Sequence, residues 1–153
     1  MLKPNTKAPL FTLKDQSGEL FDFKSLIGQK TIVLFFYPKD NTPGCTAEAC
    51  SFRDNYAGFK AYDAEVIGIS SDSSDSHQAF QNKHQLPYRL LADENSTVAK
   101  LYGLKPSMLG LLKPRVSFVI DQDGLIQHAF SAQLGVHKHI DETLRAVQRL
   151  AKV

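Results

Sequence analysis

The sequence predicts an α/β fold, in which a central β-sheet is flanked by helices. A run of apolar, β-branched and aromatic residues over 31–36 is typical of a strand buried on both faces. A helical pattern follows, then a second apolar strand over 65–70 and a further helix. This alternation indicates parallel strands joined by crossover helices. Because 153 residues can bury a full hydrophobic core, we expect one domain over residues 1–153.

The chain is expected to open with a β-hairpin. Two short alternating segments, 10–13 and 19–23, flank the turn signal at 15–18. A short turn over 24–28 then leads into the first buried strand.

The first buried strand leads through a tight loop into a helix. Residues 37–44 contain two prolines, an Asp-Asn pair and a glycine, which favour a loop. From Cys45 onward helix formers appear, and the aromatic residues at 52, 56 and 59 have the spacing of one apolar helical face. We therefore predict one helix over about 45–60, with Cys45 in its first turn.

The second half of the sequence predicts further helices, a short strand and a second hairpin. In chain order these are a helix over 76–85, a strand over 88–91, a helix over about 96–102 ended by Gly103, a hairpin of 115–121 and 125–131 across an Asp-Gly turn, and an amphipathic helix over 136–153. The apolar residues over 108–112 are expected in a loop that packs against the domain or binds a partner.

Composition excludes several classes of function. The protein is 42% hydrophobic and 22% charged, and a net charge of +2 gives no basis for binding nucleic acid or membranes. The N-terminus lacks the apolar core of a signal peptide, so we expect a cytoplasmic protein. Two cysteines in that reducing compartment favour redox chemistry over a structural disulfide.

Both cysteines fall within the predicted 45–60 helix. The first turn of a helix presents unpartnered backbone N–H groups and a partial positive charge, which favour a thiolate over a thiol. Cys45 is thus a candidate nucleophile, although a small core residue fits its position equally well. For Cys50, further along the helix, position alone favours the core.

A spaced set of residues resembles the active-site signature of the peroxiredoxins. It consists of Pro38, Thr42 and Cys45 at fixed spacing, with Arg115 some 70 residues on. The stretch 35–54 resembles in particular the Q-type subfamily, also called bacterioferritin comigratory protein. The resemblance implies a thioredoxin-like fold with a central mixed β-sheet, and an antioxidant enzyme that reduces hydrogen peroxide and organic hydroperoxides without a metal or other cofactor.

The resemblance also implies roles for individual residues. Cys45 matches the peroxidatic cysteine, Thr42 and Arg115 match its activating partners, and Pro38 matches a proline that shields the pocket. The backbone N–H groups of Gly44 and Cys45 are expected to complete the cradle for the peroxide oxygens.

Cys50 matches the resolving cysteine, which forms an intramolecular disulfide with the sulfenic acid of Cys45. Residues five apart in an ideal helix have Cα atoms about 8.7 Å apart, beyond the roughly 7 Å that a disulfide spans. We therefore expect the helix to unwind locally on oxidation. Thioredoxin or a similar dithiol protein is the expected reductant, and a monomer is sufficient for this cycle.

Simpler interpretations of the single residues remain open. Thr42 could cap the helix, Arg115 could form a surface salt bridge, and Pro38 could end the strand. Glu48 could shuttle a proton, but a favourable acid near a helix N-terminus is the preferred interpretation.

Other polar residues are expected to be uninvolved. His137 and His139 lie on different helical faces and suggest no metal site. Val116 and Ser117 replace a more usual pair of hydroxyl residues, and this departure is not expected to affect the chemistry.

Three other classes of protein are weaker alternatives. A disulfide oxidoreductase would carry Cys-x-x-Cys, but position 48 is Glu. A metallochaperone would carry Cys-x-x-x-Cys, one residue shorter than the spacing here. An interaction module, suggested by the apolar 108–112 loop, leaves the spacing of Thr42, Cys45 and Arg115 unexplained.

Overall fold

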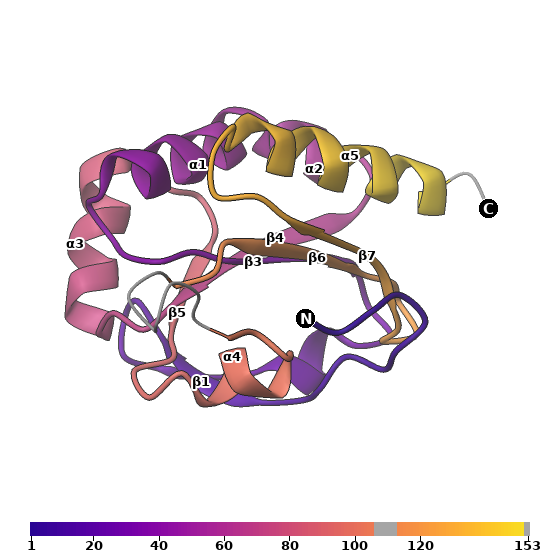
Figure 1. Cartoon of the computed structure of the whole chain (residues 1–153), viewed down its shortest axis with the longest axis horizontal. Helices are drawn as coiled ribbons and strands as arrows, with labels where there is room; N and C mark the ends of the chain where they lie inside the picture. Colours follow the sequence, from indigo (N-terminus) through magenta and orange to yellow (C-terminus); the bar gives the residue numbers. More distant parts are fainter. Residues whose placement is uncertain (106–112, 152–153) are drawn as a thin grey trace.

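The computed structural model describes residues 1–105 and 113–151, which contain a seven-stranded sheet with helices on both faces (Figure 1). The strands are β1 (Thr12–Asp15), β2 (Leu20–Asp22), β3 (Thr31–Phe36), β4 (Ala64–Ser70), β5 (Arg89–Ala92), β6 (Val116–Ile120) and β7 (Ile126–Ser131). The helices are the 3-10 helix η1 (Phe23–Leu26), α1 (Pro43–Asp54), α2 (Tyr56–Lys60), α3 (Ser74–His84), α4 (Thr97–Leu101) and α5 (His137–Ala151). The strand order across the sheet is β2-β1-β5-β4-β3-β6-β7.

The centre of the sheet is parallel and its flanks are antiparallel. β4 pairs in parallel with β3 and β5, while β1 pairs antiparallel with β2 and β5, and β6 pairs antiparallel with β3 and β7. The parallel strands are joined through α1, α2 and α3, so the predicted α/β fold, its mixed sheet and both hairpins are confirmed. Helices α1, α2 and α5 lie together on one face, and α4 lies on the other (Figure 1).

Alternate side chains of β3 enter two separate cores, because the strand is buried on both faces. Ile32, Leu34 and Phe36 belong to the core on the α4 side. Val33 and Phe35 belong to the core under α1, α3 and α5, which also contains Cys45. The continuous apolar run in the sequence is therefore explained by burial from both sides.

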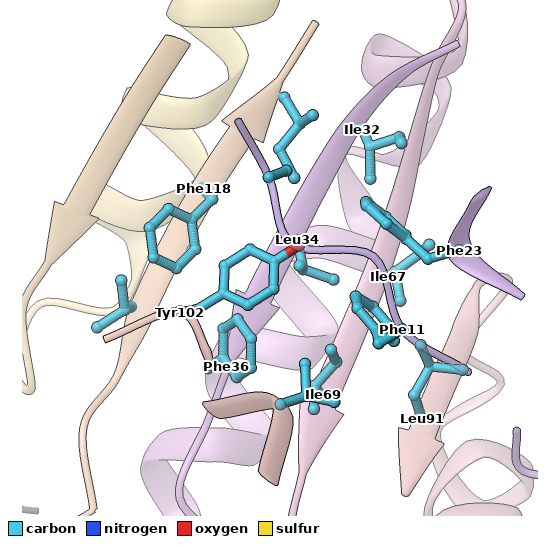
Figure 2. Packing of buried hydrophobic residues seen from close by; sticks show 14 of the residues in the cluster. Phe11, Phe23, Ile32, Leu34, Phe36, Ile67, Ile69, Leu91, Tyr102 and Phe118 are labelled. Carbon is cyan, nitrogen blue, oxygen red and sulfur yellow. The ribbon is translucent and has the colours of Figure 1, made fainter. Parts of the chain in front are cut away.

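Figure 2 shows the core on the α4 side, where Tyr102 packs at the centre. Its ring centroid lies 5.3 Å from that of Phe118, 5.4 Å from that of Phe36 and 6.2 Å from that of Phe11. Its hydroxyl donates to the Pro9 carbonyl at 2.8 Å, which satisfies the buried polar end of the side chain. This core fixes the sheet from the face opposite to Cys45.

The prediction of a single helix over 45–60 is wrong, because the structure divides this segment into α1 and α2. The break lies at Asn55, whose backbone leaves the helical region at φ −106° and ψ 7°. The Asn55 side-chain amide donates to the Ser51 carbonyl at 2.8 Å, in competition with the helical ladder. The helix also starts earlier than predicted, with Pro43 in its first turn, where a missing N–H costs nothing.

The remaining elements lie within one or two residues of their predicted bounds. The apolar loop over 108–112 and the last two residues of the predicted final helix lie outside the described residues. Across 1–105 and 113–151, no helix has the length and apolar character needed to cross a bilayer.

Candidate active site

The candidate site lies where the central strand β3 gives way to α1. β3 ends at Phe36, and α1 begins at Pro43 after a short loop. Cys45 is the third residue of α1 and is 1% exposed. The first helical hydrogen bond of this turn runs from the Thr46 N–H to the Thr42 carbonyl at 2.9 Å. The N–H groups of Gly44 and Cys45 come before it and have no acceptor within the helix. The predicted position of Cys45 in the first turn is confirmed.

Arg115 reaches Cys45 because of the register between β3 and β6. Val116, the first residue of β6, pairs with Phe36, the last residue of β3, which places Arg115 beside the end of β3. Its Nη2 donates to the Cys45 sulfur at 3.4 Å, and the Arg115 side chain is only 5% exposed. A surface salt bridge is thus the wrong interpretation of Arg115.

Gly44 makes room for the guanidinium. A Cβ at this position would lie 3.1 Å from Arg115 Nη2, closer than nearly all such contacts in proteins. Glycine here allows the close approach of a side chain to the start of the helix, because a Cβ would require the guanidinium to shift by a few tenths of an ångström.

Glu48 forms the second contact of the guanidinium. Arg115 Nη1 donates to Glu48 Oε1 at 2.7 Å, and the Glu48 side chain is fully buried. Burial raises the pKa of Glu48 to about 7, although the charge and hydrogen bond of Arg115 oppose this rise. Neither interpretation of Glu48 from the sequence foresaw this contact, which orients Arg115. The available signal was its position one turn after Cys45, on the same helical face.

Thr42 occupies the N-cap position of α1, but its side chain does not cap the helix. Its hydroxyl donates instead to the Lys39 carbonyl at 2.8 Å, which leaves the oxygen lone pairs free to accept from another donor. Helix capping by the Thr42 side chain is therefore a wrong interpretation. Pro38 is half-buried in the same loop, two residues beyond the end of β3.

A buried cluster around Asp40 holds this loop in place. The Asp40 side chain is 1% exposed and accepts hydrogen bonds from three side chains. The donors are the Tyr37 hydroxyl at 2.6 Å, the His77 Nδ1 at 2.7 Å and the Ser76 hydroxyl at 2.9 Å. We call these four residues the Asp40 cluster. It ties the loop that carries Pro38 and Thr42 to α3, and sequence analysis did not identify it.

Asp72 adds a carboxylate to the edge of the Asp40 cluster. One ligand atom each of Asp40, Asp72 and His77 lies within 4.8 Å of the others, a spacing at which a metal ion could be held. These atoms already form hydrogen bonds with one another or with nearby groups. Asp72, for example, accepts from the Asp40 N–H at 2.8 Å and from the Ser70 hydroxyl at 2.6 Å. The arrangement is accounted for by hydrogen bonding within the fold.

Cys50 lies further along α1 and is half-buried, with both cysteines present as free thiols. The preceding residue, Ala49, accepts a hydrogen bond from the buried Tyr88 hydroxyl at 2.6 Å, which anchors α1 at this point. The structure thus brings Cys45, Arg115 and Gly44 together and leaves Cys50 separated from Cys45 by intact helix.

The sequence matches one protein family and relatives that share one description. Residues 4–129 match the model of the AhpC/TSA family. The chain is 48% identical over 142 residues to "Peroxiredoxin Q, chloroplastic" of Sedum lineare, covering 93% of the chain and 76% of the relative. It is 51% identical over 138 residues to the protein of the same description from Arabidopsis thaliana, covering 90% of the chain and 63% of the relative. Because these relatives are chloroplastic, a cytoplasmic location stays a prediction.

Solved structures agree in fold. Peroxidoxin BcpB from Mycobacterium tuberculosis superposes with a TM-score of 0.91 at 35% identity, covering 98% of this chain and 99% of that one. Bacterioferritin comigratory protein from Xanthomonas campestris, described for its alkyl peroxide reduction activity, superposes with a TM-score of 0.83 at 27% identity, covering 92% of each chain. These similarities confirm the expected thioredoxin-like fold.

Proposed function

The chain belongs to the AhpC/TSA family and is a peroxiredoxin, an oxidoreductase with thiol-dependent peroxidase activity, and we propose that Cys45 is its peroxidatic residue. The observation that carries the proposal is the 3.4 Å contact between Arg115 Nη2 and the Cys45 sulfur in a buried helix start. A fixed positive charge and the helix dipole both favour the thiolate at this point.

The proposed reaction is a displacement at one peroxide oxygen. The Cys45 thiolate attacks, the O–O bond breaks, and the sulfur is oxidised to a sulfenic acid. The leaving hydroxide or alkoxide takes up a proton and departs as water or an alcohol. A stabilised thiolate is a weaker nucleophile, so much of the rate must come from donors directed at the peroxide oxygens in the transition state.

Three neighbours of Cys45 are proposed to bind the peroxide. Arg115 supplies a planar donor that lysine does not reproduce, and the Gly44 and Cys45 N–H groups point out of the helix start. Thr42 can accept from the hydroperoxide proton while donating to Lys39. Pro38 shields the site from water. The substrates are hydrogen peroxide and organic hydroperoxides, a class that includes the alkyl peroxides associated with the Xanthomonas relative.

Cys50 is proposed to resolve the sulfenic acid. Its thiol condenses with the oxidised sulfur of Cys45, releases water and forms a disulfide. The roughly 8.7 Å Cα spacing of an ideal helix must shrink below about 7 Å, so the first turns of α1 unwind. Thioredoxin or a similar dithiol protein then reduces the exposed disulfide. This cycle is complete within one domain, and we propose a cytoplasmic monomer.

Counting thiols and peroxide tests the assignment of the two cysteines. Reduced wild type should consume hydrogen peroxide, lose both thiols and recover them with dithiol reductant. Cys45→Ser should not consume peroxide at a rate above that of a free thiol. Cys50→Ser should consume one equivalent and stop at the sulfenic acid or beyond. Rapid peroxide consumption by Cys45→Ser would remove the proposal, and the mass in solution of the reduced and oxidised protein tests the monomer.

A further inference from the structure

His139 lies behind Glu48 and has no part in the proposed chemistry. It is in the first turn of α5 and is fully buried. Its Nδ1 lies 3.6 Å from Glu48 Oε2, on the side of the carboxyl group away from Arg115. Arg115, Glu48 and His139 thus form a buried row that ends at the Cys45 sulfur.

The hydrogen bonds of His139 define its protonation. Nε2 lies 2.8 Å from the Ala132 carbonyl, which can only accept, so Nε2 carries a hydrogen. Nδ1 lies 2.8 Å from the Ser117 hydroxyl, which can donate. A neutral ring therefore satisfies both neighbours, and its Nδ1, an acceptor without a hydrogen, lies 3.6 Å from Glu48 Oε2.

The remaining oxygen of Glu48 requires a proton. Glu48 Oε2 is buried and has no hydrogen-bond partner among the described residues. An ionised carboxylate would place a negatively charged oxygen beside the acceptor nitrogen Nδ1, which is unfavourable at low dielectric. A proton on Glu48 removes this conflict, because the carboxyl group then carries no charge.

We propose that His139 is a positioning residue that keeps Glu48 protonated, so that the charge of Arg115 acts on Cys45 and the peroxide instead of being neutralised by Glu48. This inference rests on the proposed role of Cys45. Burial raises the pKa of Glu48 to about 7, and burial together with Arg115 lowers the pKa of His139, which favours a protonated Glu48 beside a neutral His139. The titratable and charged groups facing the pair are Arg115 beside β6, Cys45 on α1 and the Tyr88 phenol before β5.

The proposal predicts a rate that falls at high pH. Loss of the Glu48 proton turns a neutral set of thiolate, guanidinium, carboxyl and imidazole into a buried site with a net negative charge. The second-order rate constant with hydrogen peroxide should therefore fall at high pH along a limb set by deprotonation of Glu48. Competition with a haem peroxidase for the peroxide measures this constant across pH.

Two variants should move the high-pH limb in opposite directions. In His139→Gln, the amide can donate to Glu48 Oε2 and favour the ionised form of Glu48. The high-pH limb should therefore move down by at least one pH unit, which lowers the rate constant at pH 8 about tenfold. In Ser117→Ala, Nδ1 loses its donor and is free to accept from Glu48, so the limb should move up. Neither substitution should shift the limb in a Glu48→Gln background. His137→Gln, an exposed histidine on the same helix, is the matched control.

An infrared measurement on the wild type avoids dependence on how the variants fold. A carbonyl band of a protonated carboxyl group should disappear between pH 6 and 9 and should be missing from Glu48→Gln at every pH. Absence of that band at pH 6, or an unshifted limb in both folded variants, would overturn the role of His139. Peroxide consumption that depends on Cys45 would in that case still leave the proposed function intact.

Discussion

The Cα of Gly44 and the guanidinium of Arg115 are so close that any Cβ at position 44 would lie 3.1 Å from Arg115 Nη2. This nitrogen is the one that donates to the Cys45 sulfur. The missing side chain at Gly44 therefore leaves room for the charge contact at Cys45.

Gly44→Ala should reduce peroxidase activity without unfolding the protein. The new methyl group displaces Nη2 by a few tenths of an ångström or more, and small misplacements of a catalytic donor cost about 10–100-fold in rate. Helix stability should rise slightly, because alanine is the better helix former by up to about 1 kcal/mol. Rate constants with hydrogen peroxide and thermal unfolding of the reduced protein check both results. Gly58→Ala on α2, where a Cβ meets only Leu144 at 4.0 Å, is the control.

Arg115→Lys should lower the rate constant about 10²–10³-fold, the cost of losing one aimed donor to a developing charge. Lysine offers a point charge and cannot contact Cys45 and Glu48 as a planar fork does. Arg145→Lys, at an exposed position of α5, should leave the rate constant unchanged. Equal rates for Arg115→Lys and wild type would contradict the proposed role.

Oxidation should expose the backbone of α1. Hydrogen exchange of the amides over 46–53 is expected to accelerate when the Cys45–Cys50 disulfide forms, because these residues must leave the helix. Amides of α5 serve as the internal reference, and Cys50→Ser treated with peroxide should keep its α1 protection. Full protection of 46–53 in disulfide-bonded wild type would contradict local unwinding.

Asp40→Asn should destabilise the reduced protein. His77 donates from Nε2 to the Leu91 carbonyl at 2.9 Å and meets Asp40 through Nδ1, so an amide at position 40 breaks a buried pair. Such losses cost about 3 kcal/mol or more of unfolding free energy. Urea unfolding at neutral pH measures the loss, with the exposed Asp141→Asn as control. Peroxidase activity should fall too, since the Asp40 cluster holds the loop that carries Pro38 and Thr42.

Glu48 should make stability depend on pH. Its pKa rises from 4.5 when unfolded to about 7 in the folded protein, so the native state retains a proton that the unfolded chain has released between these values. Unfolding free energy therefore falls as the pH rises from about 4.5 to 7, by about 2–3 kcal/mol from this group. The difference in unfolding free energy between wild type and Glu48→Gln should change by this amount over the same range. A pH-independent difference would contradict the buried protonated carboxyl.

The fold was largely predictable because its signals are local. The apolar run of β3, the turn before β2 and the Asp-Gly turn between β6 and β7 each define an element without reference to the rest of the chain. The break at Asn55 was missed because aromatic spacing continues across it. In the structure the backbone of Asn55 leaves the helical region, and its side-chain amide donates to the Ser51 carbonyl.

The candidate site was predictable only in part. Thr42, Cys45 and Arg115 follow a spaced pattern, and the structure brings Arg115 to the Cys45 sulfur. The contact of Glu48 with Arg115 depends on the register of β6 beside β3, and its contact with His139 depends on how α5 packs against α1 and β6, neither of which a local pattern encodes. Ser117, expected to have no bearing on the site, holds the His139 ring through Nδ1.

The end of α1 at Asp54 limits how far local unwinding can propagate along the chain. Cooperative winding and unwinding propagate along an unbroken run of helix, and the run that contains both sulfurs stops at Asp54. Beyond it, α2 is secured by Phe59, which is fully buried in the core. The unwinding proposed for the catalytic cycle should therefore be confined to the 12 residues of α1, a segment short enough to rewind within about a microsecond after reduction.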